Sequence, residues 1–152
     1  MWHGGRAVLA AAAMLALTAC GAAGGSSSIT VSQVRIPEPA GPTGAAYLTI
    51  ANDGDADDRL VAVETDVAAS TEIHESRLSN GVMSMERIDA VEVPAGDQAV
   101  LEPGGLHVML IDVDQDLTAG DTVKLTLVFD GAGEHAVDAE VVPLVGGDTP
   151  SE

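Results

Sequence analysis

The side chains that could bind a transition metal lie close together in the second half of this sequence. His74, Met83, Met85, His107 and Met109 all fall between positions 74 and 109 of the 152 residues. On a β-strand, side chains two positions apart point to the same face, which pairs Met83 with Met85 and His107 with Met109. Imidazole nitrogen and thioether sulfur together suit Cu(I), because soft sulfur donors favour it over hard divalent ions. The pattern predicts a Cu(I) site.

The ligand types also predict how such a site responds to charge and pH. Two histidines and two methionines are neutral, so a bound ion keeps its own single positive charge, which a water-poor pocket tolerates better than a higher charge. The formal net charge of −18 raises the local concentration of cations. Because protons compete for imidazole but not for thioether, we expect binding to weaken as the pH falls through about 6.5.

The spacing of four of these residues resembles a known copper motif. Ten residues separate His74 from Met85, twenty-one separate Met85 from His107, and one separates His107 from Met109. This spacing is similar to that of the PCu(A)C family of extracytoplasmic copper chaperones. The resemblance extends from about Val31 to Val142. The flanking segments that carry it are Ala45–Leu48, Glu72–Glu75, Gly81–Met85, Pro103–Leu110 and Leu125–Phe129.

The resemblance implies a fold, a ligand set and a role. The fold is a cupredoxin-like antiparallel β-sandwich with Greek-key connections, and the protein is a carrier and not an enzyme. It binds one Cu(I), and the implied ligands are His74, Met85, His107 and Met109. The implied destination is the binuclear copper centre of cytochrome c oxidase subunit II, reached directly or through another chaperone.

Two neighbouring positions need separate interpretation. The family often has Met directly after the first His, and this chain has Glu75 there, which removes one auxiliary thioether. Met83 could be a core residue or an auxiliary donor near the site, and we favour the core, because a lone Met on a strand usually fills space.

An alternating pattern of apolar and polar residues predicts the elements that must position these side chains. Val, Ile, Thr and Leu dominate the runs, and Gly- and Pro-containing turns separate them. Nine short strands without a long helical repeat indicate an antiparallel β-sandwich or small barrel over residues 29–145. Val67–Ser70 is expected to form a short helical turn. The nine predicted strands are Ile29–Ile36, Ala45–Ala51, Arg59–Thr65, Ser70–His74, Val82–Ile88, Gln98–Leu101, His107–Val113, Thr122–Phe129 and Glu134–Val142.

The N-terminal segment is typical of an exported lipoprotein. Residues 1–19 contain one Arg and an apolar run of eleven residues, as in a signal peptide, and a run this short cannot span a membrane as a helix. Cys20, the single cysteine, follows Leu-Thr-Ala in a sequence that resembles a lipobox, so we expect it to be lipidated. Residues 20–28 then form a flexible tether, and residues 146–152 a disordered tail. The implied location is the outer face of the bacterial cytoplasmic membrane, and we expect a monomer.

Composition excludes or disfavours several other classes. The low content of Lys, Arg and aromatic residues argues against nucleic-acid binding. A blue-copper electron carrier needs a Cys thiolate, and Cys20 belongs to the expected anchor. The sequence holds no Gly-x-Ser-x-Gly or His-Glu-x-x-His hydrolase motif. Asp53–Asp58 with Glu64 partly resembles a calcium loop, but it has Asp58 where the sharp turn needs Gly, so we expect a solvated acidic hairpin loop.

Two alternatives to a delivery chaperone remain open on the sequence. A copper-buffering lipoprotein would use the same site without an acceptor. A structural β-sandwich lipoprotein would bind no metal, and replacing His107 and Met109 together would then change only packing.

Overall fold

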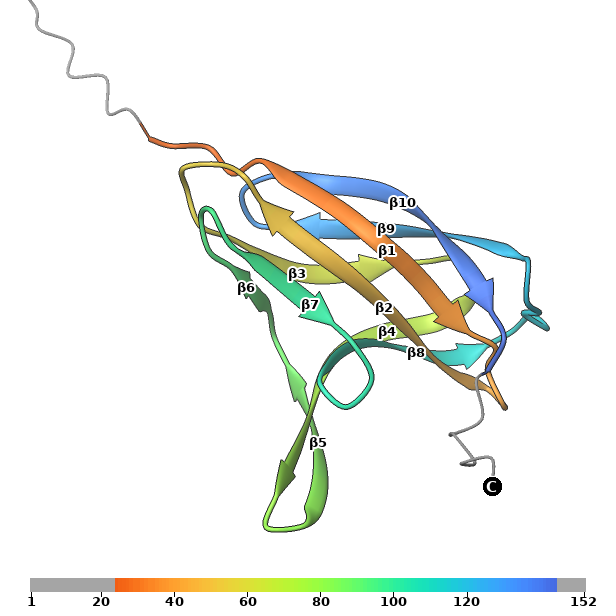
Figure 1. The fold of residues 1–152 in the computed structure, drawn as a ribbon. Coiled ribbons are helices and arrows are strands. Elements are labelled where there is room, and N and C mark those ends of the chain that lie inside the picture. The colour runs from red at the N-terminus through yellow and green to blue at the C-terminus, as the bar shows by residue number, and fades with distance from the viewer. Residues whose placement is uncertain (1–23, 145–152) are drawn as a thin grey trace, which may run out of the picture.

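Ten β-strands make up the part of the chain that the computed structural model describes, residues 24–144 (Figure 1). The expected signal segment 1–19, Cys20 and the tail 146–152 lie outside these residues. No helix long and apolar enough to cross a membrane occurs within residues 24–144. The strands are β1 (Ile29–Pro37), β2 (Thr43–Asn52), β3 (Asp58–Glu64), β4 (Ala68–Ser79), β5 (Val82–Ile88), β6 (Val91–Val93), β7 (Gln98–Leu101), β8 (Leu106–Val113), β9 (Thr122–Phe129) and β10 (Gly133–Val142).

The strands hydrogen-bond in one continuous order that folds back on itself as a sandwich. The order is β5-β4-β8-β7-β2-β1-β10-β9-β3-β6, and β8 also pairs with the first half of β2. Most pairs are antiparallel, but β1 pairs with β10 and β7 with β8 in parallel. Contacts of β3 with β4 and of β6 with β7 bring the two ends of the order together. The predicted all-β sandwich is confirmed. The alternative of a closed barrel is wrong, because β5 and β6 are edge strands that each pair on one side alone and not with each other.

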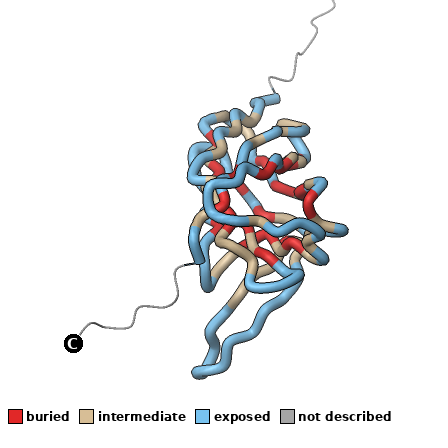
Figure 2. Tube along the Cα trace, turned by 90° about the vertical axis from the view of Figure 1, so that its right-hand side faces the viewer, coloured by how far each residue is buried: buried red, intermediate tan, exposed pale blue. Residues whose placement is uncertain are grey.

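Strict alternation along the strands buries one face of each layer. In β2, every second residue from Gly44 to Asn52 is buried, and its neighbours are half-buried or exposed. β-branched and aliphatic side chains favour this pleated, half-buried geometry. The core lies in the body of the sandwich, and the β4–β5 hairpin extends beyond it (Figure 2). Fully buried core side chains include Ile36, Leu48, Ile50, Leu60, Leu110, Leu125 and Leu127.

Three local expectations differ from the structure. The short strand β6 was not predicted, because three residues are too few to show an alternating pattern. The predicted strand Ser70–His74 is longer and spans the whole of β4. The expected helical turn at Val67–Ser70 is wrong, because Ala68 already pairs with Val113 of β8 and sheet pairing overrides the local preference.

A two-residue turn joins β4 to β5. Ser79 pairs with Val82, and both intervening residues have positive φ, 52° at Asn80 and 79° at Gly81. These are the angles of a type I′ turn, whose twist matches that of the paired strands. The Asn-Gly turn therefore fixes the register in which β5 lies beside β4.

The end of the expected tether belongs to the folded domain. We call Ser26–Ser28 the N-terminal strap, because it hydrogen-bonds along the loop after β2. The Asp53 N–H donates to Ser28 O (2.9 Å), and the Asp55 N–H donates to Ser26 O (3.1 Å). The Ser28 N–H donates to the side-chain oxygen of buried Asn52 (3.0 Å). The strap holds the N-terminal end of β1 against this loop.

Asp58 corrects the expectation of a fully solvated acidic loop. Asp58 is buried. Its carboxylate accepts hydrogen bonds from the Ser27 hydroxyl (2.6 Å) and from the backbone N–H groups of Arg59, Gly131 and Ala132 (2.7 to 2.8 Å), which offset the cost of burying a charge. Burial raises the pKa of Asp58, but these four hydrogen bonds together outweigh it and leave the pKa below its usual value of 3.8. Asp58 therefore joins the strap, β3 and the β9–β10 turn.

Candidate metal centre

The two histidines of the predicted site face each other across a pair of central strands. His74 on β4 lies directly opposite His107 on β8 in the antiparallel register. Their ring centroids are 5.8 Å apart, with the ring planes tilted by 60°. His107 is buried, and the side chain of His74 is 15% exposed. The sheet thus places two imidazoles side by side with little access for bulk water.

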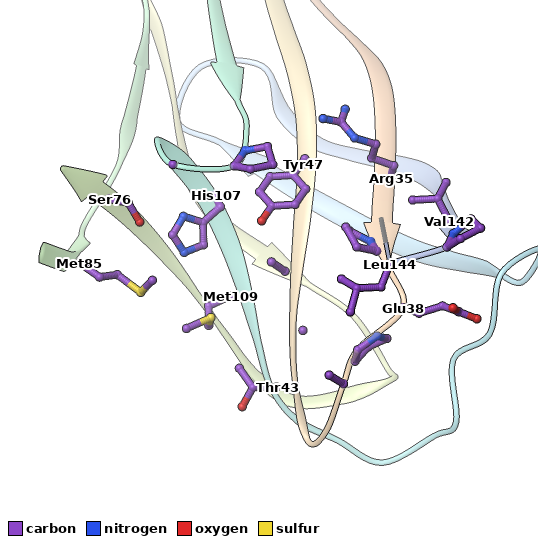
Figure 3. A pocket seen from close by; sticks show the side chains of 18 of the residues that line it. Arg35, Glu38, Thr43, Tyr47, Ser76, Met85, His107, Met109, Val142 and Leu144 are labelled. Atoms are coloured by element: carbon purple, nitrogen blue, oxygen red, sulfur yellow. The ribbon is translucent and has the colours of Figure 1, made fainter. Parts of the chain in front are cut away.

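The two predicted methionine ligands share the face of the histidines. Met109 is two residues beyond His107 on β8, so its side chain leaves the same side of the sheet. Met85 lies on β5 opposite Ser76, which is two residues beyond His74 on β4. Met85, His107 and Met109 line one cavity of about 800 Å³, and their side chains gather in one part of its wall (Figure 3). The structure therefore brings the four predicted residues to one face.

Hydrogen bonds leave one lone pair free on each imidazole. His107 Nδ1 donates to Gly105 O (3.1 Å), so its Nε2 carries the lone pair. His74 Nε2 lies 2.8 Å from Glu72 Oε2, and a carboxylate oxygen can only accept. The lone pair of His74 is therefore on Nδ1. Among residues 24–144, this buried nitrogen has no hydrogen-bond partner, as expected for a ligand position.

Glu72 holds the His74 ring in this state, and it was not among the predicted site residues. The hydrogen bond from His74 lowers the pKa of Glu72, burial opposes this effect, and the charge of Arg87 lowers it further. Arg87 Nη1 donates to Glu72 Oε1 (3.3 Å). A carboxylate that fixes the tautomer and orientation of a ligating histidine is a common feature of metal sites. Glu72 could have been found in the sequence by its position, because a carboxylate two residues before His74 on a strand lies on the same face as that histidine.

Tyr47 and Arg35 form the wall on the other side of His107. The centroids of the Tyr47 and His107 rings are 6.5 Å apart, and the Arg35 guanidinium carbon lies 5.5 Å from the Tyr47 centroid. Burial raises the pKa of Tyr47, and the charge of Arg35 partly offsets the rise. Tyr47 therefore stays neutral where it lines the cavity beside His107.

The structure corrects the interpretation of Met83 and clarifies that of Glu75. Met83 is not a core residue, since 59% of it is exposed and it lines the same cavity as Met85. It is two residues from Met85 on the edge strand β5, so both thioethers leave one face. Glu75 lies on the opposite face of β4 from His74 and forms an ion pair with Arg77 (2.5 Å).

The available donors restrict the metal that this face can hold. Within residues 24–144, no group of three or more His, Cys, Asp or Glu side chains is placed to bind an ion. Two imidazoles alone make an incomplete site, and the sulfurs of Met85 and Met109 are the further soft donors on the same face. Thioether donors select soft ions, of which Cu(I) is the biological example. The residues present therefore fit Cu(I) and do not fit a hard divalent cation.

Three known proteins are similar to this chain in sequence or in fold. The chain is 28% identical over 151 residues to Lxx21020 of Leifsonia xyli subsp. xyli (strain CTCB07), a protein named as a lipoprotein, covering 93% of this chain and 91% of that one. The copper-bound PCuAC domain from PmoF2 superposes with a TM-score of 0.65 and 28% identity, covering 76% of this chain and 92% of that domain. CuI-DR1885 from Deinococcus radiodurans has a TM-score of 0.61 and 30% identity, covering 79% of this chain and 80% of the other.

A family match completes the comparison. Residues 28–141, most of the chain, match the sequence model of the LpqE-like lipoproteins. The predicted family resemblance is confirmed by this match together with the PCuAC relatives. The chain belongs to the PCuAC family, among the LpqE-like lipoproteins.

Proposed function

We propose that the protein is an extracytoplasmic Cu(I) chaperone that binds one ion through His74 Nδ1, His107 Nε2 and the sulfurs of Met85 and Met109. The observation that carries this proposal is the buried Nδ1 of His74, which has no hydrogen-bond partner within residues 24–144. The His74 ring lies 5.8 Å from that of His107, on a face that also bears both thioethers. The copper-bound PCuAC domain from PmoF2 and CuI-DR1885 support copper as the cargo.

Ligand exchange is the proposed mechanism, and no catalytic step is involved. The histidines lie on central strands and are largely buried, whereas Met85 lies on the edge strand β5 and is 51% exposed. An incoming soft donor therefore reaches the Met85 side of the ion first. Each new copper–ligand bond replaces an old one, so the ion stays Cu(I) and is never free in solution.

The proposed acceptor is the binuclear copper centre of cytochrome c oxidase subunit II, reached directly or through a second chaperone. The proposed location is the outer face of the cytoplasmic membrane, with Cys20 as the lipidated residue. Buffering of copper is the second candidate, because it uses the same site without an acceptor. In a deletion strain at low copper, loss of oxidase assembly supports delivery, and copper sensitivity with normal oxidase supports buffering.

An anaerobic titration against a coloured Cu(I) chelator tests the site. We expect one equivalent of tightly bound Cu(I), and loss of at least about a hundredfold in affinity for His107→Ala or Met109→Ala, because each variant loses one ligand contact of about 3 kcal/mol that is not replaced. His135→Gln is the matched control, since His135 packs against Phe129 (5.4 Å between centroids) and does not line the cavity. Absence of binding by the unsubstituted chain would favour the structural lipoprotein.

A further inference from the structure

Met83 is a large apolar side chain that lies outside the hydrophobic core. It is 59% exposed, and its cross-strand partner Leu78 is 69% exposed. They form the pair next to Ser79 and Val82, which flank the turn of the β4–β5 hairpin. This hairpin extends beyond the body of the sandwich (Figure 2). Because neither contributes to the core, the presence of a thioether at position 83 calls for another explanation.

The three sulfurs on this face lie in a series from the middle of the sheet to its edge. Met109 is half-buried on the central strand β8, Met85 is 51% exposed on β5, and Met83 is two residues nearer the turn. Residues two apart on a strand are separated by roughly 6.5 to 7 Å, a gap that two flexible Met side chains can close. Met83 and Met85 line the same cavity as His107 and Met109.

The outer side of β5 is open. β5 is the first strand in the sheet order and has β4 as its single neighbour. A donor group from another molecule can therefore approach Met83 without displacing any part of residues 24–144. Met83 is the sulfur of the three that lies closest to the exposed end of the hairpin.

We propose that Met83 is a transfer ligand, a fifth donor that is outside the resting site and binds Cu(I) as the ion leaves it. This inference rests on the proposed function. The sulfur of Met83 forms a bond to the ion as the bond to one buried histidine breaks. The bonds to the second histidine and to Met109 break as two donor atoms of the incoming molecule bind, so that Met83 and Met85 are the last ligands of this chain to hold Cu(I), at the hairpin. The oxidation state does not change, and the freed imidazole regains its lone pair. The incoming donor then replaces the two thioethers.

The experiment separates equilibrium affinity from the rate of transfer. Cu(I)-loaded chain is mixed with excess bicinchoninate in a stopped-flow instrument, and affinity is measured by competition with the same chelator. For Met83→Leu, which keeps the apolar volume, we expect affinity within about threefold of the parent and a transfer rate lower by at least about fivefold. Leu78→Ala is the matched control and should change neither quantity.

A rescue variant tests whether sulfur itself is required. Leu78→Met added to Met83→Leu returns a thioether to the directly opposite position on the same face, and we expect it to restore most of the rate. An unchanged rate in Met83→Leu overturns the inference, and so does a loss of affinity as large as the loss of rate, because Met83 would then be a resident ligand. If the unsubstituted chain binds no Cu(I), the proposed function itself fails.

Discussion

A buried imidazole nitrogen without a hydrogen bond destabilises a fold, and His74 Nδ1 is such an atom within the described residues. The neighbouring Glu72 keeps Nδ1 in this state, because its carboxylate accepts the hydrogen bond from Nε2 and so fixes the orientation of the His74 ring. Arg87 in turn holds the second oxygen of Glu72. At the scale of single residues, the site is thus prepared by side chains that bind no metal.

Glu72→Gln tests this preparation directly. The amide can present its NH₂ group to His74 and so select the wrong tautomer, and we expect Cu(I) affinity to fall by about ten- to a hundredfold with one equivalent still bound. Competition titration measures the effect. Glu75→Gln is the control, because Glu75 lies on the opposite face and bonds to Arg77. Equal affinities for both variants would contradict an orienting role for Glu72.

At the residue scale, the sequence predicts which site residues share a face when they lie close together on one strand. Alternation alone predicts that Met109 accompanies His107. It does not predict that His74 lies opposite His107, because that depends on the register between β4 and β8, strands far apart in the chain. Met83 was misjudged since the apolar character of a side chain does not reveal whether its part of a strand lies inside or beyond the sandwich.

At the scale of elements, the strands that carry the site differ in how well the sheet supports them. β8 is hydrogen-bonded on both sides, to β4 and to β7 and β2, whereas β5 is bonded on one side alone. All residues of β5 except Ile88 are exposed. The position of Met85 therefore depends on the hairpin turn and its ladder with β4, and much less on core packing.

Gly81→Val tests the role of the turn. A β-branched residue at a φ of 79° strains the backbone by about 1–2 kcal/mol. If the hairpin relieves this strain by loosening β5, the Met85–copper contact weakens by a similar free energy, and we expect Cu(I) affinity to fall by roughly tenfold. Faster amide hydrogen exchange in β5 should accompany it. Gly96→Val is the control, since Gly96 has a φ of 73° and open space around it but lies in the turn before β7. An affinity loss in Gly96→Val as well would mean that the effect is global.

The strands themselves were largely predictable, because nine of them carry an alternating pattern long enough to recognise. The parallel pairing of β1 with β10 was not, since it joins the two ends of the domain and leaves no local signal. The same holds for the N-terminal strap, whose Gly- and Ser-rich sequence is typical of a flexible linker. Long-range hydrogen bonds, and not composition, decide where that linker ends.

At the scale of the whole molecule, Asp58 links three segments that are distant in sequence. For Asp58→Asn we expect the free energy of unfolding to fall by about 2–3 kcal/mol at neutral pH, because buried N–H donors lose a charged acceptor. Since the pKa of Asp58 is lower in the folded state, its contribution is present above the usual value of 3.8 and is lost as the pH falls further.

Urea unfolding of the parent and of Asp58→Asn, at several pH values between 7 and 2.5, measures the contribution of Asp58 to the free energy of unfolding. The stability difference between the parent and Asp58→Asn should shrink toward the acidic end. Asp53→Asn is the matched control, because Asp53 is exposed and its carboxylate has no hydrogen-bond partner in the described part of the chain. A difference that is independent of pH would show that ionisation of Asp58 does not stabilise the fold. Cu(I) affinity should be unchanged in both variants.

The N-terminal strap also sets a distance. β1 runs away from the strap along the length of the sandwich (Figure 1). Arg35, six residues after Ile29 on this strand, lines the cavity that also holds the thioethers. Six residues of strand span roughly 20 Å. A surface that holds the chain at its N-terminal side is thus kept one strand length away from the thioethers. If the proposed anchor at Cys20 holds the chain at a membrane, the folded domain sets this spacing, and a copper acceptor has to project at least that far from the same surface to reach the thioethers.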